Sequence, residues 1–171
     1  MYNPKNIMAG DILLMVSRPE SPWYDQVLDA GIRWSTTNPF VHACLVGEGI
    51  LINPLWHIES SPLDTYAQNG WAFHVANAVP DQRRKAVAWA MAHMGQQYGI
   101  TELVADAARD DLKIPLGERW HPHYLTCSGF VSRAWREAGI MLSYAPLPSP
   151  ADLSYSPLLL GNRPWLLPLS H

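Results

Sequence analysis

The chain has 171 residues, 48% of them hydrophobic and 16% charged, and its formal net charge is −3. This balance excludes a disordered chain and is typical of a globular protein with a buried core, so we expect one domain spanning residues 1–171. The weak negative charge is not accompanied by any basic cluster, which argues against nucleic acid as a partner.

Two cysteines, Cys44 and Cys127, are too few for a disulfide framework and favour a reducing compartment. The N-terminal residues lack the basic region and apolar core of a secretory signal. No apolar run approaches the ~20 residues that a membrane-spanning helix needs. We therefore expect no integral membrane segment, and a protein that is cytoplasmic or released without a signal peptide.

The first half of the chain favours short strands joined by turns. In chain order, the expected elements are a strand at 12–16 after Gly10-Asp11, a short helix at 24–34, hairpin arms at 40–46 and 50–53, and strands at 55–59 and 71–76. The turn between the hairpin arms is Gly47-Glu48-Gly49, a typical hairpin connection.

Helices follow in the second half. Pro80-Asp81 opens a helix that Gly95 closes, and residues 100–125 are expected to hold another short helix and a loop. A helix begins at Cys127, and the proline-rich tail at 143–171 is expected to be packed but irregular. Strands that precede helices indicate an α+β fold with a small antiparallel sheet.

Cys127 stands in the first turn of an amphipathic helix, and Thr126 before it is a suitable N-cap. The apolar face of this helix carries Phe130, Val131, Ala134, Trp135 and Ala138. The unpaired N–H groups and the dipole at a helix N-terminus favour a thiolate, the form of cysteine that attacks carbonyl carbons. A small, buried and inert cysteine is the alternative interpretation.

A cysteine nucleophile needs a base, and the base needs a group that orients its ring. His42 is the best placed of seven histidines, because it lies near the start of an otherwise apolar strand. A hairpin closed at 47–49 brings Asn53 back near His42, where the amide oxygen would accept a hydrogen bond from the ring. Glu59 and His57 are rivals for this third role, and a purely structural histidine is the alternative for His42.

Potential metal-ligand pairs two residues apart are His42 with Cys44, His57 with Glu59, and His121 with His123. None of them has the spacing of a recognised metal site, so we expect no metal. The chain has no glycine-rich phosphate loop either, and we expect no organic cofactor. Cys44 is interpreted as a buried packing residue, and His121-Pro122-His123 as a loop near the site entrance.

Together these pieces resemble the NlpC-type papain-like cysteine peptidases and amidases. Cys127-Ser128-Gly129-Phe130 is similar to the motif that carries the nucleophile of that family at the start of a helix. The other segments that resemble the family are the tyrosine-containing turn Gly95-Gln96-Gln97-Tyr98-Gly99, the first strand from Gly10 to Leu14, and the histidine hairpin from His42 to Gly47.

The order of these segments resembles a circularly permuted branch of the family, which includes YiiX-like bacterial proteins and relatives of lecithin:retinol acyltransferase. In the usual order the cysteine helix precedes the histidine strands, whereas here the strands come first. The segment 32–36 ahead of the histidine strand is also similar to that branch. The resemblance covers most of residues 10–140 and implies a papain-like fold, circularly permuted so that the histidine strands precede the cysteine helix.

The resemblance implies that Cys127 is the nucleophile, that His42 accepts and later donates its proton, and that Asn53 orients the ring. It adds Tyr98, Thr126 and Ser128 as candidates beside the substrate or the oxyanion, although a packing role is the alternative for Tyr98. No cofactor is implied.

The leading function is then a cysteine hydrolase that cleaves an amide bond, with a peptide or a peptidoglycan fragment as substrate, such as a stem peptide or a similar isopeptide. An acyltransferase or thioesterase that uses the same thiol on a lipid or acyl ester is the alternative, with Leu158–Leu160 and Trp165–Leu167 lining an acyl groove. A non-catalytic binding module on the same scaffold is the third hypothesis.

Overall fold

The structure, a computed structural model, describes residues 7–16, 38–55, 57–66, 69–96, 126–145 and 148–164. Several sequence-based expectations lie outside these residues: the helix at 24–34, the segment 100–125 with His121 and His123, the residues Tyr98 and Gly99, and the leucines after Trp165.

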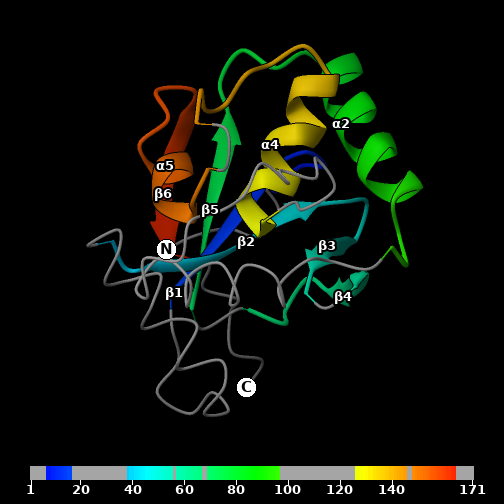
Figure 1. The fold of residues 1–171 in the computed structure, drawn as a ribbon, viewed down its shortest axis with the longest axis horizontal. Coiled ribbons are helices and arrows are strands. Elements are labelled where there is room, and N and C mark those ends of the chain that lie inside the picture. Colours follow the sequence, from blue (N-terminus) through cyan, green and yellow to red (C-terminus); the bar gives the residue numbers. More distant parts are fainter. Residues whose placement is uncertain are drawn as a thin grey trace, which may run out of the picture.

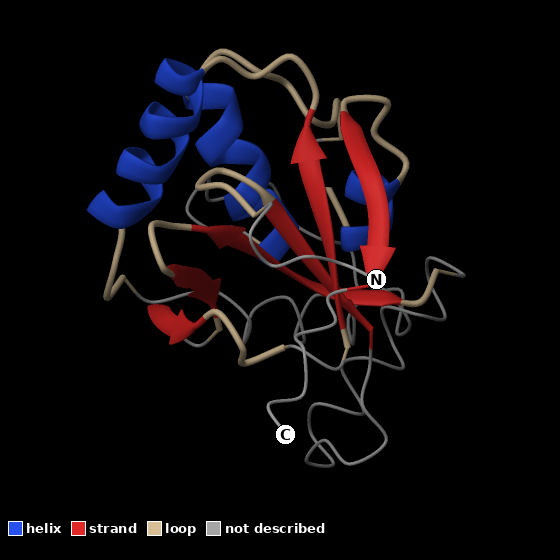
Figure 2. Ribbon diagram, turned by 180° about the vertical axis from the view of Figure 1, so that it is seen from behind, coloured by secondary structure: helices blue, strands red, loops and turns tan. Residues whose placement is uncertain are grey.

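The described residues form an α+β fold around a small antiparallel sheet, as the sequence predicts (Figures 1 and 2). The strands are β1 (Ile12–Val16), β2 (Phe40–Val46), β3 (Ile50–Pro54), β4 (Ile58–Pro62), β5 (Gly70–Val75) and β6 (Leu159–Pro164). Their order in the sheet is β4-β3-β2-β1-β5-β6, and every neighbouring pair is antiparallel. The helices are α2 (Pro80–Ala92), α4 (Cys127–Glu137) and α5 (Pro150–Ser154).

Most of the expected strands and helices are confirmed, but two strands are shifted. The third strand lies at Ile58–Pro62 rather than 55–59, and Leu55 stands before it with its N–H directed at the carbonyls of Asn53 and His57. The strand expected at 71–76 lies at Gly70–Val75. Within the described ranges, no helix is long and apolar enough to cross a membrane.

The expectation of an irregular tail at 143–171 is wrong for part of that segment. Helix α5 begins after Ser149, whose hydroxyl accepts the Asp152 N–H at 3.1 Å while the Asp152 carboxylate accepts the Ser149 N–H at 2.7 Å. Strand β6 then pairs with β5 and extends the sheet (Figure 1). An edge strand tolerates prolines because one side of it needs no ladder hydrogen bonds, and this explains how a proline-rich segment joins the sheet.

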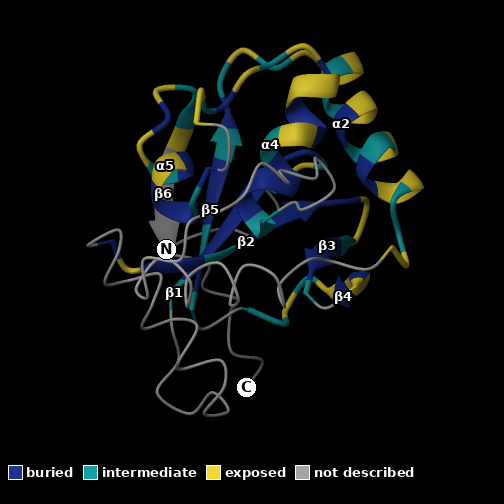
Figure 3. Ribbon diagram, viewed as in Figure 1, coloured by how far each residue is buried: buried dark blue, intermediate teal, exposed yellow. Residues whose placement is uncertain are grey.

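Both faces of the sheet are covered, and the buried strands appear as the centre of the molecule in Figure 3. Helices α2 and α4 pack together on one face, where the rings of Trp89 and Phe130 lie 5.4 Å apart. That face contributes alternate strand residues such as Ile12, Leu14, Ala43, Leu45 and Ile52. The opposite face carries Leu13, Met15, Cys44, Val46 and Leu51, with Leu63 and Tyr66 packed against them.

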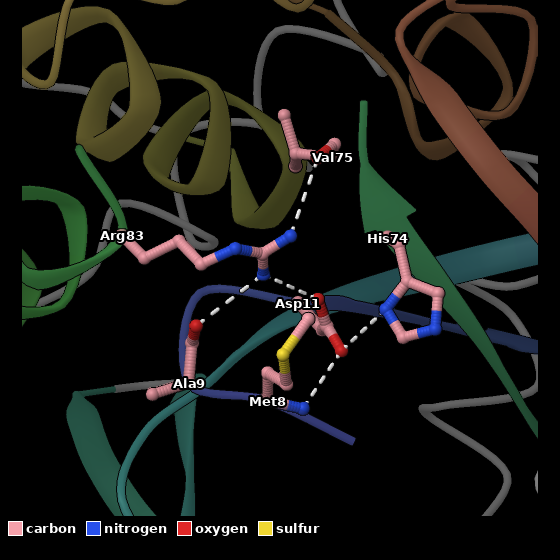
Figure 4. A network of polar contacts seen from close by, with 6 residues as sticks. All are labelled: Met8, Ala9, Asp11, His74, Val75 and Arg83. Atoms are coloured by element: carbon pink, nitrogen blue, oxygen red, sulfur yellow. Dashed lines mark hydrogen bonds and ion pairs between the residues drawn. The ribbon is translucent and has the colours of Figure 1, made fainter. Parts of the chain in front are cut away.

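The Gly10-Asp11 pair fastens α2 to the sheet. The fully buried Asp11 carboxylate accepts the Met8 N–H at 2.9 Å and Arg83 Nη1 at 2.6 Å, and His74 Nδ1 lies 2.7 Å away (Figure 4). Arg83 also donates to the Val75 carbonyl, so one guanidinium joins α2 to β5 and to the start of β1. Gly10 has a φ of 91°, and a Cβ there would lie 3.1 Å from the Trp135 ring, so a glycine is required at this turn.

Candidate active site

A side-chain cap holds the N-terminus of α4. Thr126 Oγ1 accepts the Gly129 N–H at 3.0 Å, which confirms Thr126 as the N-cap. A Cβ on Gly129 would lie 2.9 Å from the same oxygen, so the glycine of the Cys-Ser-Gly-Phe segment is needed for the cap to close. The apolar face expected on this helix is confirmed, because Phe130, Val131, Ala134, Trp135 and Ala138 are all buried.

The thiol of Cys127 lies at this helix start, against β2. Burial alone would raise its pKa, but the pKa is lowered overall because the charge of His42, a hydrogen bond with the His42 side chain, and the N–H groups of Ala43 and Ser128 stabilise the thiolate. The β2–β3 ladder pairs Leu45 with Ile52 and stops two residues short of Ala43, which leaves that N–H clear of the ladder. The sequence identified the helix but not this contribution from the sheet.

A β-bulge lies beside His42 in β2. Met15 of β1 pairs with His42 whereas Val16 pairs with Phe40, so Val41 is an extra residue between them. Phe40 and Ala43 both pack on the helix-covered face. Strict alternation would place residues three apart on opposite faces, and the extra residue accounts for the difference. Bulges commonly re-aim a side chain next to a functional site, and this one lies at the point where His42 meets the start of α4.

His42 has Cys127 and Asn53 as neighbours. Its Nε2 lies 2.8 Å from Asn53 Oδ1, which confirms the expected proximity of these two residues across the hairpin. Burial lowers the pKa of His42, but its charge interactions and hydrogen bonds with the Cys127 and Cys44 thiols outweigh burial and raise the pKa well above its ordinary value. A raised histidine pKa beside a lowered cysteine pKa favours a thiolate–imidazolium pair.

Asn53 itself is buried and makes further contacts on the face of the sheet opposite the helices. Its Nδ2 donates to Ser61 Oγ at 3.1 Å and to the hydroxyl of Tyr66 at 2.9 Å. Cys44 is buried, as expected, but it does more than pack, because its thiol donates to Asn53 Oδ1 at 3.1 Å and lies 3.7 Å from His42 Nε2. Burial raises the pKa of the Cys44 thiol, so Cys44 favours the neutral, hydrogen-bond-donating form.

The other candidates from the sequence that the structure describes are exposed or are engaged in other contacts. Glu59 pairs with Asn53 in the sheet, but it is exposed, and His57 is exposed as well. The hydroxyls of Thr126 and Ser128 both donate to the Pro148 carbonyl, which ties the start of α4 to the segment before α5. Both hydroxyls therefore help to hold the start of the helix.

Sequence reasoning missed Ser61 and Tyr66. Ser61 lies on β4 opposite Leu51, and Tyr66 ends the turn that leads towards β5, so both reach Asn53 from segments beyond the hairpin. The sequence gives no signal for Ser61, because only the β3–β4 register shows that residue 61 shares a face with residues 51 and 53. No local pattern marks Tyr66.

The described residues offer no metal centre: no group of three or more His, Cys, Asp or Glu side chains among them is placed to hold an ion. The chain was compared with models of known protein families and with curated proteins, and neither comparison gives a match. The candidate site therefore rests on its own geometry.

Proposed function

We propose that the chain is a cysteine hydrolase that cleaves amide bonds with Cys127 as nucleophile. The observation that carries the proposal is the position of His42, whose charge and hydrogen bond lower the pKa of Cys127 while its Nε2 bonds to Asn53. A thiol at a helix start, a base beside it and a group that orients the base are the three parts of nucleophilic catalysis by cysteine.

In the proposed first step the Cys127 thiolate attacks the carbonyl carbon of the substrate amide. The oxyanion that forms accepts from the backbone N–H of Cys127, which lies in the first turn of α4 and has no intrahelical acceptor. With Nε2 bonded to Asn53, Nδ1 of His42 gives its proton to the leaving amine as the C–N bond breaks. The products are a free amine and a thioester on Cys127.

In the second step water attacks the thioester carbonyl. Neutral His42 accepts a proton from the water, the C–S bond breaks, and the acid product leaves. Cys127 returns as the thiolate beside a protonated His42, so atoms and charges balance over the cycle. The N–H groups of Ala43 and Ser128 stabilise the sulfur whenever it carries its charge.

We further propose that the fold is the circularly permuted papain-like arrangement suggested by the sequence. Two observations support this. The hairpin of β2 and β3 precedes α4 in the chain, and His42 of β2 contacts Cys127 of α4. The substrate class that this resemblance suggests is a peptide amide, in particular a peptidoglycan stem peptide or similar isopeptide.

The acyl-transfer alternative receives no support from the described residues. Its acyl groove was expected to include Leu158–Leu160, but Leu159 and Leu160 belong to β6, which is three strands away from β2 in the sheet. Leu158 and Leu159 pack against the core on the helix side instead. We therefore propose hydrolysis as the primary activity.

The test is turnover of a panel of peptide amides, including isopeptides, by the wild-type protein and Cys127→Ala. We expect the wild type to release amine and Cys127→Ala to lose turnover while keeping its circular-dichroism spectrum. Cys44→Ala, which removes the other thiol, should lose only a few-fold. A Cys127→Ala variant with full activity would contradict the mechanism. A stable acyl adduct on Cys127 after exposure to an acyl ester would favour transfer over hydrolysis.

A further inference from the structure

The side-chain amide of Asn53 is engaged on both its oxygen and its nitrogen. Oδ1 faces His42 Nε2 at 2.8 Å and the Cys44 thiol at 3.1 Å. Nδ2 donates to Ser61 Oγ at 3.1 Å and to the Tyr66 hydroxyl at 2.9 Å. Because the two hydrogens of the amide nitrogen lie in the amide plane and point apart, these two oxygens fix the orientation of the group.

We propose that Tyr66 and Ser61 are positioning residues for the catalytic histidine, acting through Asn53. By accepting both N–H bonds of Asn53, they keep its oxygen turned towards His42. The inference rests on the proposed function, because the orientation matters for catalysis only if His42 carries the positive charge of the resting pair.

The charge on His42 determines which end of the amide can face it. An imidazolium donates from both ring nitrogens and has no acceptor, so only the oxygen of Asn53 can bond to it. The reversed amide would direct an N–H group at the Nε2–H group and disfavour the imidazolium. The acceptors of the amide nitrogen therefore favour the protonation state of His42 that stabilises the Cys127 thiolate.

Tyr66 is the more informative of the two residues. It ends the turn after β4, and its ring lies edge-on to His42 with centroids 6.2 Å apart. Burial raises the pKa of the Tyr66 hydroxyl, which keeps the group neutral as an acceptor for Asn53. The titratable groups that act on His42 are Cys127 of α4 and Cys44 of β2, while His42, Cys44 and Glu59 of β4 act on the pKa of Tyr66.

The experiment uses Tyr66→Phe, which removes the hydroxyl and keeps the ring. The alkylation rate of Cys127 by iodoacetamide is measured against pH, and mass spectrometry of the peptides separates it from alkylation of Cys44. We expect the acid limb of the Cys127 profile to move up by about half a pH unit, or about threefold in rate on the limb, the size of one net hydrogen bond. Tyr144→Phe, at a tyrosine that is 90% exposed, is the matched control and should leave the profile in place.

A double-variant cycle separates positioning from a general loss of structure. If Tyr66 acts through Asn53, adding Tyr66→Phe to Asn53→Ala moves the limb no further, whereas an independent role moves it by the full amount again and overturns the proposal. An unchanged limb in Tyr66→Phe alone also overturns it. If Tyr66→Phe does not fold, Ser61→Ala asks the same question at the other N–H bond of the amide.

The two proposals fail in different ways. A wild-type Cys127 that alkylates with the profile of an ordinary thiol contradicts the proposed function and removes the basis for positioning as well. The other outcome is a wild-type alkylation rate that rises at a pH below that of an ordinary thiol and rises at the same pH in Tyr66→Phe. That result contradicts the positioning role alone.

Discussion

At the scale of single residues, burial opposes the charged form of both Cys127 and His42. Burial raises the pKa of Cys127 and lowers that of His42, so each group alone would be neutral in this place. Placing the two together reverses both shifts, and the N–H groups of Ala43 and Ser128 add to the effect on the sulfur. The reactive state is therefore a property of the pair rather than of either side chain.

Asn53 is expected to be the third member of the site. Asn53→Ala removes a hydrogen bond to a charged ring, and we expect kcat/KM to fall about 10- to 100-fold, the range for a bond worth roughly 1.5–3 kcal/mol. Steady-state kinetics on the amide substrate measure this. Glu59→Gln is the matched comparison, because Glu59 pairs with Asn53 in the sheet but is exposed, and it should keep its kcat/KM. An equal loss in both variants would show that Asn53 has no special role.

The sequence allows the His42–Asn53 contact to be predicted because both residues lie in one hairpin with a short turn. The strand register pairs Leu45 with Ile52, which continues to Cys44 opposite Asn53, so the histidine reaches the asparagine diagonally. Ser61 and Tyr66 were not predicted, since their contacts depend on the register of β4 and on the turn that follows it.

At the scale of elements, α4 depends on its cap. Thr126→Ala removes the acceptor for the Gly129 N–H and one tie to Pro148, and we expect it to lower the free energy of unfolding by about 1 kcal/mol. Urea unfolding measures the change. Thr126→Ser keeps the hydroxyl and should stay near the wild type. If Thr126→Ser loses as much stability as Thr126→Ala, the threonine methyl group rather than the cap is what matters.

Strands and helices with a strong period were predictable, and the proline-rich tail was not. The capping sequence Ser149-Pro150-Ala151-Asp152 is a local signal for the start of α5 that could have been recognised. Strand β6 has no such signal, because Leu159–Pro164 lacks alternation and pairs with β5, which is far away in sequence. Long-range pairing of this kind depends on an open sheet edge that only the folded protein presents.

At the scale of the whole molecule, Asp11 connects the start of β1, β5 and α2 (Figure 4). Asp11→Asn removes the charge that Arg83 pairs with, and the Arg83 side chain is only 13% exposed. We expect the free energy of unfolding to fall by about 3 kcal/mol, because a largely buried cation loses its partner. Urea unfolding measures this as well.

The control for Asp11 is an ion pair on the surface. Glu137→Gln breaks the Arg133–Glu137 pair, in which both side chains are at least 40% exposed, and it should change stability by less than about 1 kcal/mol. Equal losses in Asp11→Asn and Glu137→Gln would contradict the anchoring role of Asp11. The α+β class followed from strands that precede helices, but the role of Gly10-Asp11 as an anchor emerged only with Arg83 and His74 in place.

The most direct test of the account is the pH dependence of Cys127 alkylation in the wild type and in His42→Ala. The lowered pKa of Cys127 and the raised pKa of His42 both favour the thiolate–imidazolium pair over the neutral pair. The wild-type rate should therefore begin to rise below the pH of about 8.5 at which an ordinary thiol ionises. His42→Ala should move that rise upward, because the buried thiolate loses its positive neighbour. A wild-type profile centred at the ordinary thiol pKa, or one that His42→Ala leaves unchanged, would contradict the account.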